Sequence, residues 1–502
     1  MYRILTASKD TYITNKVINN KFRATDANVG KAGTLDLFKL YAETTSGSDT
    51  SPTEISRVLI KFDLGPLKAL TGTLLDFSHT SFKCTLRLTD VYGGQTTPSN
   101  FTLIAFPLSQ SFDEGSGIDI VNFSDLDSCN FITASATTTS TNWFHTGANN
   151  QGLLGSDNLD IISSGNLGNG VVNIWKSQVF SDGAEDLSID VTNIISGTLA
   201  GQIPDHGFRI SYSGSQETDT KTRFVKRFSS RHATSVHNRP KLIVTYDDAV
   251  IDHHKSFFFN LTGSLFLNNS HRGQNANILS GTAAATVSGT NSIVLRLISG
   301  SYSGSFTGSQ HKIGDNFITG VYSASFAVSE FETALRSEIV NAASATFTEI
   351  WGSTDSTVGY HTGSLVINSV NRTSFNNVPK RLFVNVTNVK SIYKFSEKVR
   401  FRVYAEDISR TVKAVKTPID TPSEIFIKMY YQIRDADSNR VVIPFETKSN
   451  GTRLSTDSDG MYFDFYMDSL ASGKTYIFDF LISDGGSDQV YTNIPAKFKL
   501  EK

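Results

Sequence analysis

Residues 400–406 read RFRVYAE, in which apolar and polar side chains alternate. Alternation with a period of two is the signature of a strand that buries one face of a sheet. Further runs of this kind recur along the chain, separated by clusters of Gly, Ser, Asn and Asp, whereas helical periodicity is rare. These runs are RVLIKFDL (57–64), KCTLRLTDV (83–91), FTLIAFPL (101–108), KLIVTYD (241–247), SIVLRLIS (292–299), RLFVNVTNV (381–389), IFIKMYYQI (425–433), MYFDFYMD (461–468) and TYIFDFLIS (475–483). The sequence therefore predicts an all-β protein of tandem β-sandwich domains.

Two segments predict short helices. SEFETALRSEIVNAA (329–343) opens with Ser329 and Glu332, which match a capping box. DVTNIISGTLAG (190–201) opens at Asp190. In the first segment three apolar residues lie four positions apart and define one face, namely Phe331, Leu335 and Ile339.

One low-complexity stretch, GSYSGSFTGSQ (300–310), is expected to be an edge strand or a loop. Its only large apolar side chains, Tyr302 and Phe306, offer little surface for packing.

The chain has 502 residues, which is too long for one hydrophobic core. Polar stretches at 244–256 and 385–398 suggest two boundaries. We expect a large sandwich (1–249), a middle β-domain with one short helix (250–389) and an immunoglobulin-like sandwich (390–502).

Composition narrows the classes of function. Lys and Arg number 46 against 48 Asp and Glu, and this balance argues against a nucleic-acid partner. The 2 cysteines are too few for a disulfide framework. No long apolar run predicts a membrane span, and the opening MYRILTASKDTYI lacks the apolar region of a signal peptide. We expect synthesis in a cytoplasm without classical export.

Motifs of common enzymes are missing from the sequence. It contains no HExxH, CxxC, GxxxxGK[ST] or GxSxG pattern. No catalytic residue is therefore assigned, and a non-enzymatic protein is expected.

A basic stretch, FVKRFSSRHATSVHNRPKLIVTYDD (224–248), allows two interpretations. Its cations could contact an anion or a neighbouring subunit, or they could pair with Asp residues of the same sandwich, which is the favoured interpretation. Strand alternation places Lys226 and Phe228 on one side and Arg227 on the other, so the patch is split between faces. The candidate contact residues are Arg223, Lys226, Arg227, Arg231 and Arg239.

Calcium is the one cofactor that the sequence raises. In DADSNRVVIPFE (435–446), four residues occupy ligand positions of a calcium loop, namely Asp435, Asp437, Asn439 and Glu446. The position that should be Gly is Arg440, and VVIPF reads as a strand, so a hairpin turn is preferred. Carboxylates also cluster at Asp182, Glu185 and Asp186 and at Asp457 and Asp459, where exposed turns are again preferred.

Trp143, within NWFHTGA, is the best candidate for a sugar-binding platform because polar residues surround it. The alternative is a core position, which is favoured because tryptophan is highly buried on average.

The first block resembles the DNRLRE-type domain, a β-sandwich module related to certain carbohydrate-binding modules. The resemblance rests on RVLIKFDLGPL (57–67), on DVT (190–192) within LSIDVTNII, and on FSSRHATSVHNRPKLIVTY (228–246). The chain departs from that pattern at His232, where a glutamate is expected after Arg231. Any contact of that glutamate is therefore not carried over.

The whole chain is similar to structural proteins of marine T4-like tailed phages. Phrases that carry this likeness include SFDEGSGIDIVNFSDLDSCNF, AGQIPDHGFRISYSGSQE, FVKRFSSRH and DGMYFDFYMDSLASGKTYIFDF. The resemblance implies a non-enzymatic virion component of the tail, neck or baseplate, assembled in the host cytoplasm. Its implied partners are other virion proteins and copies of itself.

Two other functions stay open at this stage. The first is a carbohydrate-binding adhesin that contacts a host-surface glycan through the first domain. The second is a polysaccharide-degrading enzyme, for which no catalytic constellation is found.

Overall fold

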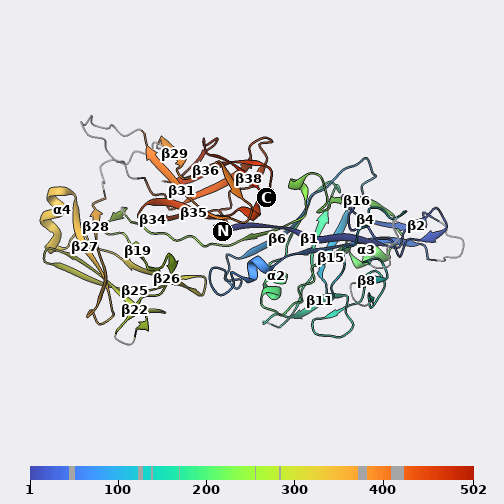
Figure 1. Cartoon of the computed structure of the whole chain (residues 1–502), viewed down its shortest axis with the longest axis horizontal. Helices are drawn as coiled ribbons and strands as arrows, with labels where there is room; N and C mark the ends of the chain where they lie inside the picture. Colours follow the sequence, from blue (N-terminus) through green and yellow to red (C-terminus); the bar gives the residue numbers. More distant parts are fainter. Residues whose placement is uncertain are drawn as a thin grey trace. The chain divides into compact units, whose positions relative to one another are not determined.

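The computed structural model describes residues 1–44, 51–122, 128–136, 140–168, 170–254, 256–281, 284–370, 381–408, 423–484 and 486–502. The chain divides into two compact units. The N-terminal unit comprises Arg3–Thr71 and Phe82–Thr245, and the C-terminal unit comprises Met1–Tyr2, Gly72–Ser81 and Tyr246–Lys502. Both units consist of mainly antiparallel sheets with few short helices (Figure 1), which confirms the expected all-β fold.

A ten-stranded sheet forms the frame of the N-terminal unit. Eight of its strands follow one another in the order β13 (Lys176–Phe180), β7 (Phe101–Pro107), β15 (Phe208–Tyr212), β5 (Thr53–Phe62), β1 (Tyr2–Thr14), β17 (Lys241–Thr245), β6 (Lys83–Leu88) and β14 (Leu187–Asp190). The remaining two, β4 (Thr34–Tyr41) and β16 (Arg223–Ser229), branch from β5 because β4 pairs with both β5 and β16.

Shorter elements complete this unit. The helices are α1 (Gly65–Lys68), α2 (Thr192–Leu199), α3 (Gly214–Thr218) and the 3-10 turn η1 (Val236–Asn238). Small sheets pair β2 (Val17–Ile18) with β3 (Phe22–Arg23), β8 (Thr133–Ser135) with β9 (Thr141–Asn142), and β11 (Ile161–Asn166) with β10 (Gln151–Leu153) and β12 (Val171–Asn173). Helix α2 confirms the prediction for 190–201, and Asp190 accepts a hydrogen bond from the backbone N–H of Thr192.

The two end strands of the eight-strand order, β13 and β14, are neighbours along the chain and are joined by one side chain. The Gln178 amide donates to the carbonyl of Asp186 at 2.8 Å and accepts the N–H of Ser188 at 2.6 Å. The Gln178 side chain thereby links the two end strands in the way that backbone hydrogen bonds link the other neighbouring strands of the sheet. Because unpaired sheet edges invite association, this bridge protects two edges at once.

Aromatic rings fill the interior of this sandwich. Phe180 of β13 stacks on Phe101 of β7 at 4.8 Å between ring centroids, and it meets Phe228 of β16 edge-on at 6.4 Å. Both Phe180 and Phe228 are fully buried. Three strands that are distant in sequence thus share one core, and each buried ring contributes roughly 1.5–3 kcal/mol of hydrophobic stabilisation.

The C-terminal unit begins its regular structure with a seven-stranded sheet. The order is β18 (Phe257–Phe258), β28 (Gly359–Asn368), β27 (Ser344–Gly352), β24 (Ile293–Ser299), β25 (Tyr302–Ile313), β26 (Asn316–Phe326) and β19 (Gly263–Asn268). Two small hairpins pair β20 (Ser270–His271) with β21 (Gln274–Asn275) and β22 (Leu279–Ser280) with β23 (Ala285–Thr286).

Strand β25 corrects the expectation for residues 300–310. It is neither an edge strand nor a loop, since it pairs with β24 on one side and β26 on the other. Its two rings do pack, with Tyr302 edge-on to Phe347 at 5.7 Å and Phe306 against Phe326 at 5.8 Å. The small residues between them leave room for these contacts.

The helix expected at 329–343 exists but begins later than predicted. It consists of the 3-10 turn η2 (Thr333–Leu335) and α4 (Arg336–Ala342). The capping box is wrong, because the Ser329 hydroxyl accepts the N–H of Phe331 rather than that of Glu332. The predicted apolar face is also wrong at its first position: Leu335 is buried and Ile339 packs on the core, but Phe331 is 81% exposed.

The described residues between 382 and 501 form an immunoglobulin-like sandwich of two sheets. One sheet has the order β29 (Leu382–Val386), β31 (Lys398–Asp407), β35 (Gly460–Tyr466) and β34 (Ser455–Asp457). The other has the order β30 (Ile392–Lys394), β38 (Lys497–Glu501), β36 (Thr475–Asp484), β32 (Met429–Asp435) and β33 (Val441–Ile443), with β37 (Ser487–Tyr491) paired to β36. A 3-10 turn, η3 (Met467–Ser469), follows β35.

The alternation of RFRVYAE is realised in β31. Phe401, Val403 and Ala405 are buried, while the residues between them are partly exposed. Phe401 lies edge-on to Phe478 at 4.9 Å and tilted against Phe463 at 5.3 Å, so it joins the two sheets. The ten alternating runs all contain a strand, and the division into three domains at residues 249 and 389 stays a prediction.

Candidate functional site

The basic stretch predicted from the sequence lies on β16 and the turn that follows it. Lys226, on β16, is fully buried, and its Nζ donates to three oxygens. These are Asp90 Oδ1 at 2.5 Å and the backbone carbonyls of Gly183 at 2.6 Å and Glu185 at 2.8 Å. The rings of Phe180 and Phe228 flank the ammonium at 5.2 and 4.9 Å. An ammonium has three protons to donate, so this one is saturated within the fold.

Arg227 points away from Lys226, as strand alternation predicts. Its Nε and Nη2 donate to the two carboxylate oxygens of Asp36, on the neighbouring strand β4, at 2.7 and 2.6 Å. This bidentate pair raises the pKa of the Arg227 guanidinium, chiefly through the hydrogen bond to Asp36.

Arg223, at the start of β16, forms a second bidentate pair. Its Nη1 and Nη2 donate to Asp219 at 2.9 and 2.8 Å. The same carboxylate accepts the ammonium of Lys39, a fully buried residue of β4 opposite Arg223 in the register. Lys39 also donates to the carbonyl of Lys221 at 2.8 Å. Charged side chains thus join β4 and β16 at two positions, through the Arg227–Asp36 pair and through Asp219, which binds both Arg223 and Lys39.

Arg231 lies in the turn after β16 and binds Glu114 in a bidentate pair, Nε–Oε1 2.5 Å and Nη2–Oε2 2.7 Å. Glu114 also accepts the backbone N–H of Asp10, on β1, at 2.9 Å. The N–H of Arg231 in turn donates to Asp10 Oδ2 at 2.6 Å. His232, the next residue, places Nε2 at 3.5 Å from Glu114 Oε1. A second carboxylate at this position would face Glu114 instead.

Asp10 is the most perturbed group of this cluster. The residue is 1% exposed, and its Oδ1 has no hydrogen-bond partner. Burial raises the pKa of the carboxyl to about 7, with a further contribution from the nearby Glu114 charge. The hydrogen bond from the Arg231 backbone opposes this shift.

The five candidate cations therefore contact groups of their own unit. Arg239, the last of them, donates from Nε to the carbonyl of Ala233 at 3.0 Å. Lys226, Arg227 and Arg231 therefore do not converge on one point. Each of them binds a different carboxylate, namely Asp90, Asp36 and Glu114, respectively. Such an arrangement stabilises the sandwich and holds its loops.

Sequence reasoning missed a second charged cluster, which lies on β5 and β15. Arg57 donates to Glu217 at 3.0 and 2.7 Å and to the carbonyl of Gly147 at 2.7 Å. Arg209 donates to the carbonyl of Ala148 at 3.0 Å, and burial lowers the pKa of its guanidinium to about 9. The available signal was an arginine within each of two apolar strands, RVLIKF and FRISY.

A close crossing of two backbones was also missed. Gly30 and Gly117 lie so close to the opposite segment that an added Cβ would stand 1.9 Å from the carbonyl oxygens of Glu114 and Asn28, respectively. The buried Asn28 amide fastens the crossing, since Nδ2 donates to the carbonyls of Glu114 and Cys129 at 2.9 Å and Oδ1 accepts the N–H of Gly117 at 2.9 Å. The glycines of NVGKAG and DEGSG are the signal that could have found it.

The structure contradicts a sugar platform at Trp143. The side chain is 4% exposed and belongs to an apolar cluster with Phe106, Phe112 and Phe131. Its indole Nε1 donates to the carbonyl of Asn130 at 3.0 Å. The core position that was favoured for Trp143 is therefore confirmed, and the polar residues next to it in the sequence were a misleading signal.

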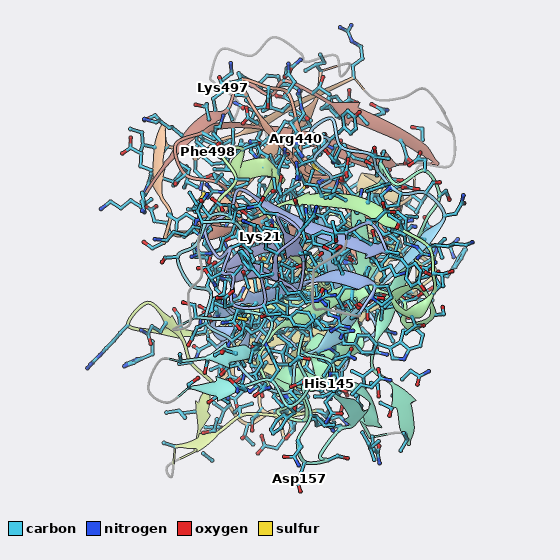
Figure 2. All side chains as sticks on the ribbon, turned by 90° about the vertical axis from the view of Figure 1, so that its right-hand side faces the viewer. Lys21, His145, Asp157, Arg440, Lys497 and Phe498 are labelled. Carbon is cyan, nitrogen blue, oxygen red and sulfur yellow. The ribbon has the colours of Figure 1, made fainter. Side chains whose placement is uncertain are left out.

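The first residues of the candidate calcium loop, 435–446, form a turn between β32 and β33. Asp435 is fully buried at the end of β32, and its Oδ1 accepts the N–H groups of Asp437 and Ser438, both at 2.9 Å. Asn439 has φ 56° and precedes Arg440, labelled in Figure 2, in a hairpin to β33. Glu446 Oε1 instead accepts the backbone N–H groups of residues 448 and 449. These contacts are those of a turn, which is the interpretation preferred for DADSNRVVIPFE from the sequence.

The other acidic clusters also act as turns and ion pairs. Glu185 accepts N–H groups of its own loop, Ser181 at 2.7 Å and Gly183 at 2.8 Å. Asp186 accepts the N–H of Asp90 at 2.9 Å, and Asp457 binds Arg402 at 2.6 Å. Across the described ranges, no three His, Cys, Asp or Glu residues come together in a way that could hold a metal ion.

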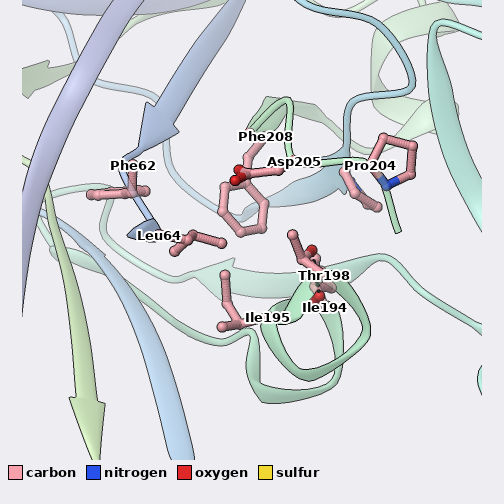
Figure 3. A pocket seen from close by; sticks show the side chains of 10 residues that line it. Phe62, Leu64, Ile194, Ile195, Thr198, Pro204, Asp205 and Phe208 are labelled. Carbon is pink, nitrogen blue, oxygen red and sulfur yellow. Dashed lines mark hydrogen bonds between the residues drawn. The ribbon is translucent and has the colours of Figure 1, made fainter. Parts of the chain in front are cut away.

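A small cavity lies beside α2 in the N-terminal unit (Figure 3). Its volume of about 10 Å³ would accommodate at most one water molecule. The lining is mainly apolar and includes Phe62, Leu64, Ile194, Ile195 and Phe208. This cavity is too small to serve as a substrate cleft.

The fold and the site define a protein of all-β sandwiches in which the cations of β16 and of the turn after it contact groups of their own unit. No helix in the described ranges is long and apolar enough to cross a membrane. No protein-family model and no curated protein matches the chain.

Solved structures with some similarity include the N-terminal Ig1-2 module of the Drosophila receptor protein tyrosine phosphatase DLAR. It is 9% identical, with a TM-score of 0.14, over 48% of this chain and 91% of that chain. A putative membrane-anchored protein from Corynebacterium diphtheriae is 10% identical, with a TM-score of 0.15, over 100% of this chain and 97% of that chain. Similarity this low carries no argument about function.

Proposed function

We propose that the chain is a non-enzymatic structural protein of a tailed-phage virion, placed in the tail, neck or baseplate. It acts through contacts with other virion proteins and with copies of itself, and it is assembled in the host cytoplasm. The sequence resemblance to virion proteins motivates this proposal. The structural observation that supports it is the internal pairing of the β16 cations, which suits a rigid building block better than an anion-binding site.

A building block of this kind gains its affinity from interface area. Subunit contacts of the usual size bury on the order of 1,600 Å² and need rigid, preformed surfaces. The side-chain bridge between β13 and β14 and the charge cross-links between β4 and β16 supply rigidity in the N-terminal unit. The sandwich of β29–β38 has an interior of packed aromatic rings that serves the same purpose.

The test is the composition of purified particles. Phage particles from a lysate are separated on a density gradient, and peptides of this chain are quantified by mass spectrometry in each fraction. We expect a constant ratio to the major virion proteins across the particle peak, while a host cytoplasmic protein used as a control stays at the top of the gradient. Recovery of this chain only in the particle-free fractions would contradict the proposal.

The alternative of a carbohydrate-binding adhesin depended on an exposed Trp143, and this side chain is buried. No observation on the described residues favours it over the structural role.

A further inference from the structure

In the C-terminal unit, hydrogen bonds join two loops that expose apolar side chains. Asn260 accepts the N–H of Glu330 on Oδ1 at 3.1 Å, and its own N–H donates to the carbonyl of Val328 at 2.9 Å. Asn260 has φ 62°, a conformation that turns the chain sharply after β18. These bonds fix the segment 257–261 beside the segment 328–331.

The exposed side chains of these two segments are large and apolar. Phe331 is 81% exposed, Leu261 56% and Phe258 40%. Glu330 and Glu332 flank Phe331 in the sequence, and the nearest basic residues along the chain are Lys255, before Phe258, and Arg336, at the start of α4. We call Phe258, Leu261, Phe331, Glu330 and Glu332 the acidic apolar surface.

A surface of opposite charge lies on an edge of the C-terminal sandwich. Strand β30 is the last strand of its sheet and pairs only with β38 within the described ranges. Ile392 is 49% exposed and Phe395 41%, and the exposed Lys390 and Lys394 flank them. Glu397 is the acidic residue nearest along the chain, and its carboxylate accepts the N–H of Lys394. We call Ile392, Phe395, Lys390 and Lys394 the basic apolar surface.

We propose that the acidic apolar surface of one copy of the chain binds the basic apolar surface of a second copy. Each surface offers two or more large apolar side chains with charges of one sign, and the two signs are complementary. Two acidic apolar surfaces would repel each other, so each contact joins an acidic apolar surface to a basic one in a head-to-tail arrangement. A head-to-tail contact closes into a ring or continues as a helical array.

The inference rests on the proposed role in subunit contacts, and it names the partner as a second copy. Burying rings such as Phe331 and Phe395 supplies the affinity, since aromatic residues in the centre of an interface carry most of the binding energy. The glutamates and lysines at the border select the partner and the orientation.

Two defective variants of the full chain test the head-to-tail geometry. Phe331→Asp removes the acidic apolar surface and leaves the basic one, whereas Ile392→Asp does the reverse. Sedimentation velocity should show oligomers of the wild type at about 10 µM and above, and each variant alone should associate about tenfold more weakly. Mixing the two variants should restore a complex of one copy of each, because each retains the surface that the other lacks.

Val490→Asp is the matched control, since Val490 on β37 is 54% exposed and belongs to neither surface. This variant should associate like the wild type, and thermal unfolding of all three variants should match the wild type because the residues are exposed. A wild type that stays monomeric up to about 100 µM, or a variant mixture that forms no complex, would overturn the inference. The proposed virion role would stand in that event if the particle fractions contain the chain.

Discussion

Several buried cations of the N-terminal unit have partners far away in sequence, and single residues therefore hold distant segments together. Lys226 and Asp90 are separated by 136 positions, and Arg57 and Glu217 by 160. A buried charge that loses its partner leaves an uncompensated charge in an apolar region. The effects of substitutions at these residues should consequently be large and local to this unit.

We expect Lys226→Met to destabilise the N-terminal unit by about 3–5 kcal/mol, because it leaves Asp90 and two carbonyls without the ammonium. Urea denaturation followed by tryptophan fluorescence measures the effect. The exposed Lys21, labelled in Figure 2, offers the control Lys21→Met, which should change stability by less than about 0.5 kcal/mol. Equal effects of the two substitutions would contradict a structural role for Lys226.

The backbone crossing at Gly30 is a second feature of single residues. Gly30→Ala places a Cβ 1.9 Å from the carbonyl oxygen of Glu114, so the segments must separate. We expect a loss of about 1–3 kcal/mol or more in the free energy of unfolding. Gly33→Ala, at a position with nothing within 4 Å of the added atom, is the matched control and should be neutral or slightly stabilising. A neutral Gly30→Ala would show that the crossing is loose.

At the scale of elements, strands were predictable and their neighbours were not. Residues 300–310 were expected at an edge because Tyr302 and Phe306 stand among small residues. Pairing with β24 and β26 places that segment inside the seven-stranded sheet. Local composition indicates whether a segment can form a strand. The position of that strand in a sheet depends on hydrogen bonds to remote segments.

The bridge between β13 and β14 gives a prediction for elements. Gln178→Ala removes two hydrogen bonds that join the end strands, and we expect a loss of about 1–3 kcal/mol. Hydrogen exchange of the backbone amides in 176–190 should accelerate more than exchange elsewhere in the unit. Gln202→Ala serves as the control, because Gln202 is exposed and follows α2 rather than a sheet end. Unchanged exchange in 176–190 would refute the bridging role.

At the scale of the whole molecule, each unit contains a buried carboxyl with a raised pKa. Burial raises the pKa of Asp10 in the N-terminal unit and of Asp252 in the C-terminal unit to about 7, against 3.8 for an exposed aspartate. The folded state thus binds a proton more tightly than the unfolded state. The stability contributed by each carboxyl is complete below the unfolded pKa and is lost as pH rises through about 7.

These two carboxyls should consequently make the chain unfold at a higher temperature near pH 5 than near pH 8. Comparison with a variant that lacks one carboxyl separates its contribution from that of the other carboxylates. Asp10→Asn and Asp252→Asn should each raise the melting temperature at pH 8 and change it little near pH 4. Differential scanning calorimetry over this pH range measures the effect. A melting temperature that either substitution lowers at pH 8 would show that the carboxylate is needed in its charged form.

The sequence by itself determined the class of the fold, because alternation with a period of two is a local property that each strand carries. It also determined that Lys226 and Arg227 face opposite sides, for the same reason. Only the tertiary structure decided which carboxylates these cations bind. Those pairs join segments more than a hundred positions apart, and such contacts leave no periodic mark on the sequence.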